Sequence, residues 1–354
     1  MKMPFIQLDK LTRLIAAIGF ISTSILVLLF IFLTVYFVKR DFGSYRNLLI
    51  AFSILGFAFS SSEYIVHPMI HSYSAGFVYF TNPSSLFSNE AMKIGLVLFC
   101  GIYGATVCFI AIQFLYRYWA LFDVNKMKWF EGWKISIWFF YSLFIGTIWA
   151  IGIFHFLEND DYSLDYFRQG VRQHYSLELS SIPSFTSLIY TRNGDVRWKN
   201  LMCTVEMTMI IGMQYLIICF CGRKMSTGMK EKISMLSETS RRLHTQFFKS
   251  LVLQIVVPTF LLFLPMIVII YLPLFNLEFS FPTGILFSAF AIYPAIDIAI
   301  ILYIVCDYRN AIKYVWKTMK TTCVPERYIP PEISFPVCTI QNLVAYPIQT
   351  TRMV

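Results

Sequence analysis

Hydrophobic residues gather in long runs that are separated by shorter polar segments. The last run, from Gly284 to Cys306, is almost unbroken. At about 1.5 Å per residue, a helix of this length crosses a hydrocarbon layer of roughly 30 Å. Seven such runs occur, at about residues 14–38, 48–65, 94–115, 135–157, 201–221, 251–272 and 284–306. The pattern therefore predicts an all-α membrane protein, a bundle of seven transmembrane helices.

The segments outside residues 14–306 are short. We expect residues 1–13 to form an outer tail, because the run that begins at Leu14 is too long for a signal peptide. Residues 307–322 predict an amphipathic helix on the inner leaflet, since Ile312, Val315, Trp316 and Met319 share one face. Residues 323–354 contain several prolines and little periodicity, which predicts an irregular cytoplasmic tail.

Charge placement predicts the orientation. Most of the 29 lysine and arginine residues lie after the first, third and fifth runs and in the tail. Because such residues stay preferentially on the cytoplasmic side, we expect the carboxyl terminus inside and the amino terminus outside. Three basic residues before the first run, Lys2, Lys10 and Arg13, disfavour an outer amino terminus. The excess of lysine and arginine in the inner segments outweighs them. The net charge of +9 then suits contact with anionic membrane lipid, and no nucleic-acid partner is predicted.

Composition supports the same class. Hydrophobic residues make up 57% of the chain and charged residues 14%, against about 25% charged in soluble domains. The eight cysteines show no metal-site spacing, so neither a metal nor a cofactor is predicted. Whether Cys100 pairs with Cys203, and whether Cys323 carries a lipid, stays open.

Two loops stand out by length. The outer loop from Glu158 to Asn200 is long enough for a lid or a binding surface, with a partly ordered solvated loop as the alternative. On the inner side, residues 222–249 lack proline and predict basic helical extensions of the fifth and sixth spans.

A family resemblance extends over nearly the whole chain. Its residues are GSYRNLL from Gly43, SSEYIVHP from Ser61, IQFLYRYWAL from Ile112, the run from Leu236 to Pro265, and YPAIDIAIILYIVCDYRNAI from Tyr293. Together they resemble the nematode seven-transmembrane chemoreceptors of the Str and Srj group.

The resemblance implies a G-protein-coupled receptor for a small, often volatile, environmental or pheromonal molecule. Its partners would be that ligand and a heterotrimeric G protein, and its location the plasma membrane of sensory cilia. Homo- or hetero-dimerisation stays open. Two features depart from the family pattern: Ile298, not proline, follows Asp297, and no acid directly precedes Arg117.

Candidate coupling residues lie at the inner ends of the spans. Arg117 can contact a docked G-protein helix, or it can be a simple positive anchor. Arg241 and Arg242 are weaker candidates, because a solvated basic face explains them better than a role in coupling does. For switching, Pro258 and Pro294 free backbone carbonyls and allow helices to bend. Asp297 either joins a polar switch network or is a buried structural acid.

Candidate ligand contacts lie in the outer halves of the third, fifth, sixth and seventh spans, because small molecules need a mostly apolar pocket with a few polar groups. The alternative for each is ordinary core packing. They are Phe99, Tyr103, Glu206, Met209, Met266, Phe287, Phe290 and Tyr293.

Other function classes are less well supported. A seven-helix ligand-gated cation channel would place its amino terminus inside, opposite to the charge pattern. A transporter would favour internal repeats or paired broken helices, which the sequence does not display. Motifs of hydrolytic enzymes are also missing, so no catalytic activity is predicted.

Overall fold

A computed structural model describes residues 5–37, 43–234, 252–281 and 284–322 of the chain. Seven helices in these ranges are long and apolar enough to cross a membrane. They are α1 (Phe5–Tyr36), α2 (Gly43–Val66), α3 (Asn89–Phe122), α4 (Ile135–Phe156), α6 (Trp198–Ser234), the helix over 252–275, and α9 (Gly284–Ile304). The predicted seven-helix bundle is therefore confirmed.

Several boundaries differ from those predicted. Helix α1 begins at Phe5, inside the segment that was expected to be a tail. Helix α6 ends at Ser234, beyond the predicted end of the fifth span, in agreement with the predicted helical extension of that span on the inner side. The sixth span contains a π-helical turn (Thr259–Phe263), then α8 (Leu264–Tyr271) and a 3-10 turn (Leu272–Phe275). After α3, short 3-10 turns at Val124–Phe130 and Gly132–Lys134 lead into α4.

Helix α3 lies at the centre of the bundle. Of the residues in the most apolar stretch of α3, 67% are buried, compared with 28% in the corresponding stretches of the helices α1 and α4. Small residues allow the close approach of its neighbour α4: a Cβ atom on Gly146 would collide with the carbonyl oxygen of Gly101. Such contacts are the usual means of helix association in lipid, where hydrophobicity does not drive helices together.

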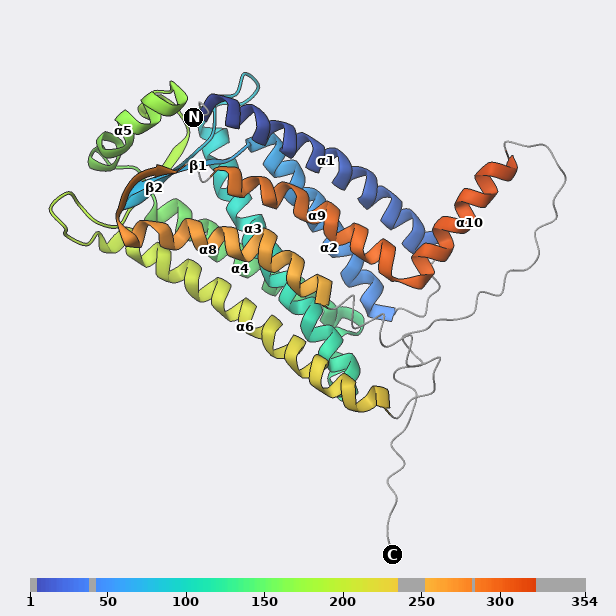
Figure 1. The fold of residues 1–354 in the computed structure, drawn as a ribbon. Helices are drawn as coiled ribbons and strands as arrows, with labels where there is room; N and C mark the ends of the chain where they lie inside the picture. Colours follow the sequence, from blue (N-terminus) through green and yellow to red (C-terminus); the bar gives the residue numbers. More distant parts are fainter. Residues whose placement is uncertain (1–4, 38–42, 235–251, 282–283, 323–354) are drawn as a thin grey trace, which may run out of the picture.

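The amphipathic helix α10 (Cys306–Thr322) lies at the end of the bundle opposite the start of α1 (Figure 1). Tyr308 and Ala311 are buried, and the Tyr308 hydroxyl is 2.9 Å from that of Thr34 in α1. Trp316 remains 63% exposed. An exposed indole on a helix of this kind suits contact with the inner leaflet.

A four-stranded antiparallel sheet covers the outer end of the bundle, where the sequence predicted no strands. Its order is β3-β2-β1-β4, with β1 (Met69–Ser74), β2 (Gly76–Phe80), β3 (Ser184–Leu188) and β4 (Leu277–Phe281). The strands come from three different outer loops, so the sheet fastens these loops to one another. Figure 1 shows it beside the start of α1.

The long outer loop is ordered, which favours the lid over the solvated alternative. It forms α5 (Asp161–Tyr175), a 3-10 turn (Leu179–Ser181) and β3. Phe167 and Val171 of α5 are buried against the sheet. On the sheet side, His71 is buried beside His174, and this burial together with the neighbouring imidazole lowers the pKa of His71 to about 4. His71 is therefore neutral near pH 7.

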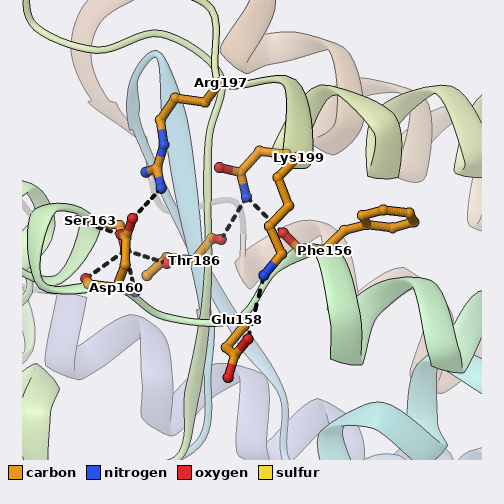
Figure 2. A network of polar contacts seen from close by, with 8 residues as sticks. Phe156, Glu158, Asp160, Ser163, Thr186, Arg197 and Lys199 are labelled. Carbon is orange, nitrogen blue, oxygen red and sulfur yellow. Dashed lines mark hydrogen bonds and ion pairs between the residues drawn. The ribbon is translucent and has the colours of Figure 1, made fainter.

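A polar network holds this outer cap, which we define as the sheet with α5 (Figure 2). Arg197, just before α6, pairs with Asp160, the N-cap of α5, while Lys199 lies 3.4 Å from Glu158. The side-chain amide of Asn200 donates to the carbonyl of Phe156 at 2.9 Å. Burial opposes ionisation of Asp160, but hydrogen bonds from Ser163 and the charge of Arg197 outweigh it and hold the pKa below its ordinary value.

We predict that Asp160→Ala loosens α5, because the Asp160 side chain accepts a hydrogen bond from the backbone N–H of Ser163. The reverse bond of this capping box, from the backbone N–H of Asp160 to the Ser163 hydroxyl, does not need the carboxylate. Loss of an N-cap costs about 1 kcal/mol, which corresponds to roughly fivefold faster amide hydrogen exchange over residues 161–175. Asp160→Asn is the matched control, since asparagine caps equally well. If the amides of α5 were equally protected from hydrogen exchange in the Asp160→Ala variant and the native chain, Asp160 would not be a stabilising cap.

Candidate functional site

An aromatic cluster fills the outer half of the bundle. Phe99 and Tyr103 come from α3, and Phe287 and Phe290 from α9. Ring centroids lie 5.8 Å apart for Phe99 and Phe287 and 5.2 Å apart for Tyr103 and Phe290, and all four side chains are buried. Phe59 of α2 adds a stacked contact to Phe99 at 5.1 Å. The structure thus brings together four of the predicted ligand residues and adds Phe59.

Two further predicted residues border this cluster. Tyr293 lies one turn further along α9 and is fully buried, and Met266 of α8 belongs to the same hydrophobic core.

Two predicted ligand residues lie elsewhere. Met209 is 70% exposed on the outside of the bundle, where lipid would surround it, so its assignment to a pocket is wrong. Glu206 points at α4, since a Cβ atom on Gly152 would overlap its carboxylate. It therefore lies between α6 and α4.

A polar group that the sequence analysis did not select lies beside the aromatic cluster. Glu63 of α2 is 4% exposed, and its Oε2 atom has no hydrogen-bond partner in the described part of the chain. It interacts electrostatically with Tyr79 of β2. The Tyr79 hydroxyl donates to the carbonyl of Leu96 at 3.0 Å and accepts from the thiol of Cys100 at 3.4 Å. Cys100 and Cys203 are both free thiols, so this pair is not bridged.

The sixth span is irregular where it meets the aromatic cluster. Pro258 is buried directly before the π-helical turn, in which the N–H of Leu264 reaches back to the carbonyl of Thr259. The Tyr103 hydroxyl donates to the carbonyl of Leu262 inside that turn at 3.1 Å. Such turns are frequent at functional sites. One ring of the cluster is thus bonded to the backbone of the sixth span.

The remaining switch candidates lie on α9. Pro294 packs against Gly56 of α2, and α9 continues through it without a break. Asp297, one turn further on, is 5% exposed, and its Oδ2 atom lacks a hydrogen-bond partner among the residues described. Arg117 is near enough to interact with it electrostatically.

Arg117 connects α3 to the sixth span near the inner end. Its guanidinium donates to the side-chain oxygen of Gln254, which is 5% exposed, and it lies 5.9 Å from the centre of the Phe114 ring. No acid directly precedes Arg117, and its side chain contacts the Gln254 amide rather than a neighbouring carboxylate of α3. Arg241, Arg242 and Cys323 lie outside the described residues.

Comparisons with known proteins agree with the seven-helix fold. The family model described as serpentine type 7TM GPCR chemoreceptor Str matches residues 12–313. The chain belongs to the Str family of serpentine chemoreceptors. It is therefore a multi-pass membrane protein of a chemosensory receptor family.

Individual relatives of this Str-family chain are also nematode receptors. G-protein coupled receptor str-33 of Caenorhabditis elegans is 35% identical over 314 residues, covering 87% of this chain and 91% of the relative. G-protein coupled receptor str-217 of the same species is 25% identical over 308 residues, covering 85% and 88%. Serpentine receptor class r-10 of C. elegans is 23% identical over 277 residues, covering 77% and 81%.

The fold is similar to that of squid rhodopsin. The TM-score is 0.56 over 90% of this chain and 88% of the rhodopsin, with 13% sequence identity. At that identity the likeness shows the seven-helix architecture alone.

We predict that Phe290→Ala destabilises the Str-family chain by on the order of 3 kcal/mol, because a fully buried ring leaves a cavity. Met209→Ala, on the lipid-facing surface, is the matched control and is expected to change stability little. The stability of both variants is measured by thermal unfolding of the purified proteins in nanodiscs, with the accessibility of the cysteines as the signal for unfolding. Similar melting temperatures for the two variants would show that the aromatic cluster does not support the bundle.

Proposed function

We propose that the chain binds a small molecule in the outer half of the bundle and activates a heterotrimeric G protein at its inner face. The hydrogen bond from Tyr103 to Leu262 is the observation that carries the proposal, because it joins the aromatic cluster to the backbone of the sixth span. Any change that a ligand makes at the cluster then bears directly on that span. The plasma membrane of sensory cilia is the proposed location.

The ligand site consists of the aromatic cluster together with Glu63. A buried carboxyl oxygen without a partner is costly, and a ligand with an N–H or O–H group would supply one. Aromatic faces add attraction for a cationic group. Small amines and alcohols with an apolar body are therefore the proposed ligand class.

Signalling depends on the inner contact between Arg117 and Gln254. A hydrogen bond to a charged group contributes about 1.5–3 kcal/mol, so this contact favours the arrangement in which the sixth span lies against α3. Separation of the two would release the Arg117 guanidinium from Gln254 and allow it to contact backbone carbonyls of a docked G-protein helix. A ligand drives this step only by binding the separated arrangement more tightly.

We predict opposite effects for the two partners in cells that express the receptor with a G-protein reporter. Gln254→Ala should raise ligand-independent signalling severalfold, because it removes the contact but keeps the arginine. Arg117→Ala should abolish responses to an odorant panel at equal surface expression. Arg223→Ala, on the exposed inner part of α6, controls for loss of one positive charge.

Two results would count against the coupling proposal. One is an unchanged odorant response in Arg117→Ala, and the other is a loss of response in Arg223→Ala as large as that in Arg117→Ala. The first removes Arg117 from coupling, and the second reduces its role to general charge.

Glu63→Gln tests the ligand class in the same assay. The amide keeps the size of the side chain but cannot ionise, so a cationic ligand loses its ion-pair partner. Responses to amines should therefore weaken at least tenfold, while those to alcohols change less. Asp195→Asn, which removes an exposed acid from the outer loop before α6, is the control. Equal amine potency in the Glu63→Gln and native receptors would exclude Glu63 from the site.

A further inference from the structure

A cleft of about 300 Å³ lies in the outer cap, where the start of α3 meets the long outer loop. Its volume is at the lower end of the range for small-molecule sites. Glu90 and Lys93 line it from α3, and Leu164 lines it from α5. Polar groups from the rest of the loop complete the wall, at Asn159, Ser181 and Ser184. None of these residues belongs to the aromatic cluster.

Hydrogen bonds fix the walls of this cleft. The Asn89 side chain donates to the carbonyl of Ser181 at 3.0 Å, which joins α3 to the loop. The Asn159 amide donates to both oxygens of Ser184 at 3.0 Å. Asn159 also lies between Glu158 and Asp160, which take part in the network of Figure 2. The cleft is thus a built feature of the cap.

Opposite charges line the cleft without pairing. Glu90 and Lys93 are three residues apart on α3, and within the described ranges neither makes an ion pair at 4.0 Å or less. The Lys93 ammonium lies 5.1 Å from the centre of the Phe185 ring, a position that suits a cation–π contact. Lys93 is half-buried, so its charge is only partly solvated.

Asn159 supplies a further unsatisfied group. Its Oδ1 atom is buried and has no hydrogen-bond partner in the part of the chain that the structure describes. Because buried acceptors are nearly always paired, this oxygen calls for a donor from outside the chain. The nearby walls from Leu164 and Leu179 are apolar.

We propose that this cleft binds a small zwitterion of the α-amino acid class. The carboxylate would pair with Lys93, the ammonium would bond Glu90 and the Asn159 oxygen, and a short side chain would lie against Leu164 and Leu179. Side chains three apart on a helix lie about 5–6 Å apart at Cβ, a spacing that one molecule with both charges bridges. A plain anion would meet the repulsion of Glu90, and a plain cation that of Lys93.

Saturation-transfer NMR on the full-length receptor in nanodiscs tests this proposal, with empty nanodiscs as the lipid control. The probes are L-serine and L-leucine, with acetate and methylammonium as ligands that carry a single charge. We expect at least one of the amino acids to bind at least tenfold more tightly than either single-charge probe. Equal binding of acetate would mean a simple anion site and would overturn the zwitterion class.

Variants locate the binding. Lys93→Met should weaken amino-acid binding at least tenfold, Lys93→Arg should retain it, and Glu90→Gln should raise acetate affinity relative to that of the amino acids. Arg192→Gln removes an exposed positive charge elsewhere on the outer face and should change nothing. Thermal unfolding of each variant verifies that the cap is intact.

Absence of amino-acid binding to the native receptor, or unchanged binding in a folded Lys93→Met variant, would refute the site. The measurement needs no G protein, so its outcome is independent of the coupling proposed above.

Discussion

The structure depends on the absence of water in the hydrocarbon layer, because every backbone N–H and C=O there needs a partner from the chain itself. Regular helices meet this need, and the strands are confined to the outer end. The one π-helical turn described inside a span is tolerated because side-chain hydroxyl groups donate hydrogen bonds to backbone carbonyls in and next to it. Thr259 donates to the carbonyl of Ile255 at 2.7 Å, and Tyr103 to that of Leu262 at 3.1 Å.

The outer cap follows from the same constraint. Loops that leave the membrane still carry backbone groups, and the sheet pairs those of three loops at once. Helix α5 then covers the sheet with its apolar side, and ion pairs at the start of α6 fasten the assembly to the bundle. The outer end is therefore braced at several points, whereas at the inner end Arg117 of α3 donates to Gln254 of the sixth span. The activation that we propose would therefore move the inner end.

Sequence predicted those features that have a strong local signal. The spans could be predicted because an apolar run of about 20 residues is stable in few settings besides a membrane. Helix α10 could be predicted because it has one apolar face and one basic face. The sheet was missed, since pairs such as Tyr79 with Phe185 join distant loops and the strands are buried on both faces. Met209 was misassigned because a transmembrane helix is apolar both toward lipid and toward the core. Its sequence therefore shows how deep a residue lies in the membrane, but not which side of the helix faces the bundle. Glu63 did carry a signal, as a lone acid within an apolar run, and only the structure shows that its oxygen lacks a partner among the described residues.

The energies of the two contacts of the sixth span suit control by a small molecule. A neutral hydrogen bond such as that of Tyr103 contributes about 1 kcal/mol, and one to a charged group about 1.5–3 kcal/mol. Their sum corresponds to a shift of roughly two to three powers of ten in the equilibrium between arrangements, since about 1.4 kcal/mol is tenfold. A ligand of about a dozen atoms can supply a differential affinity of that size. Much stronger contacts would lock the span, and much weaker ones would leave the receptor active without ligand.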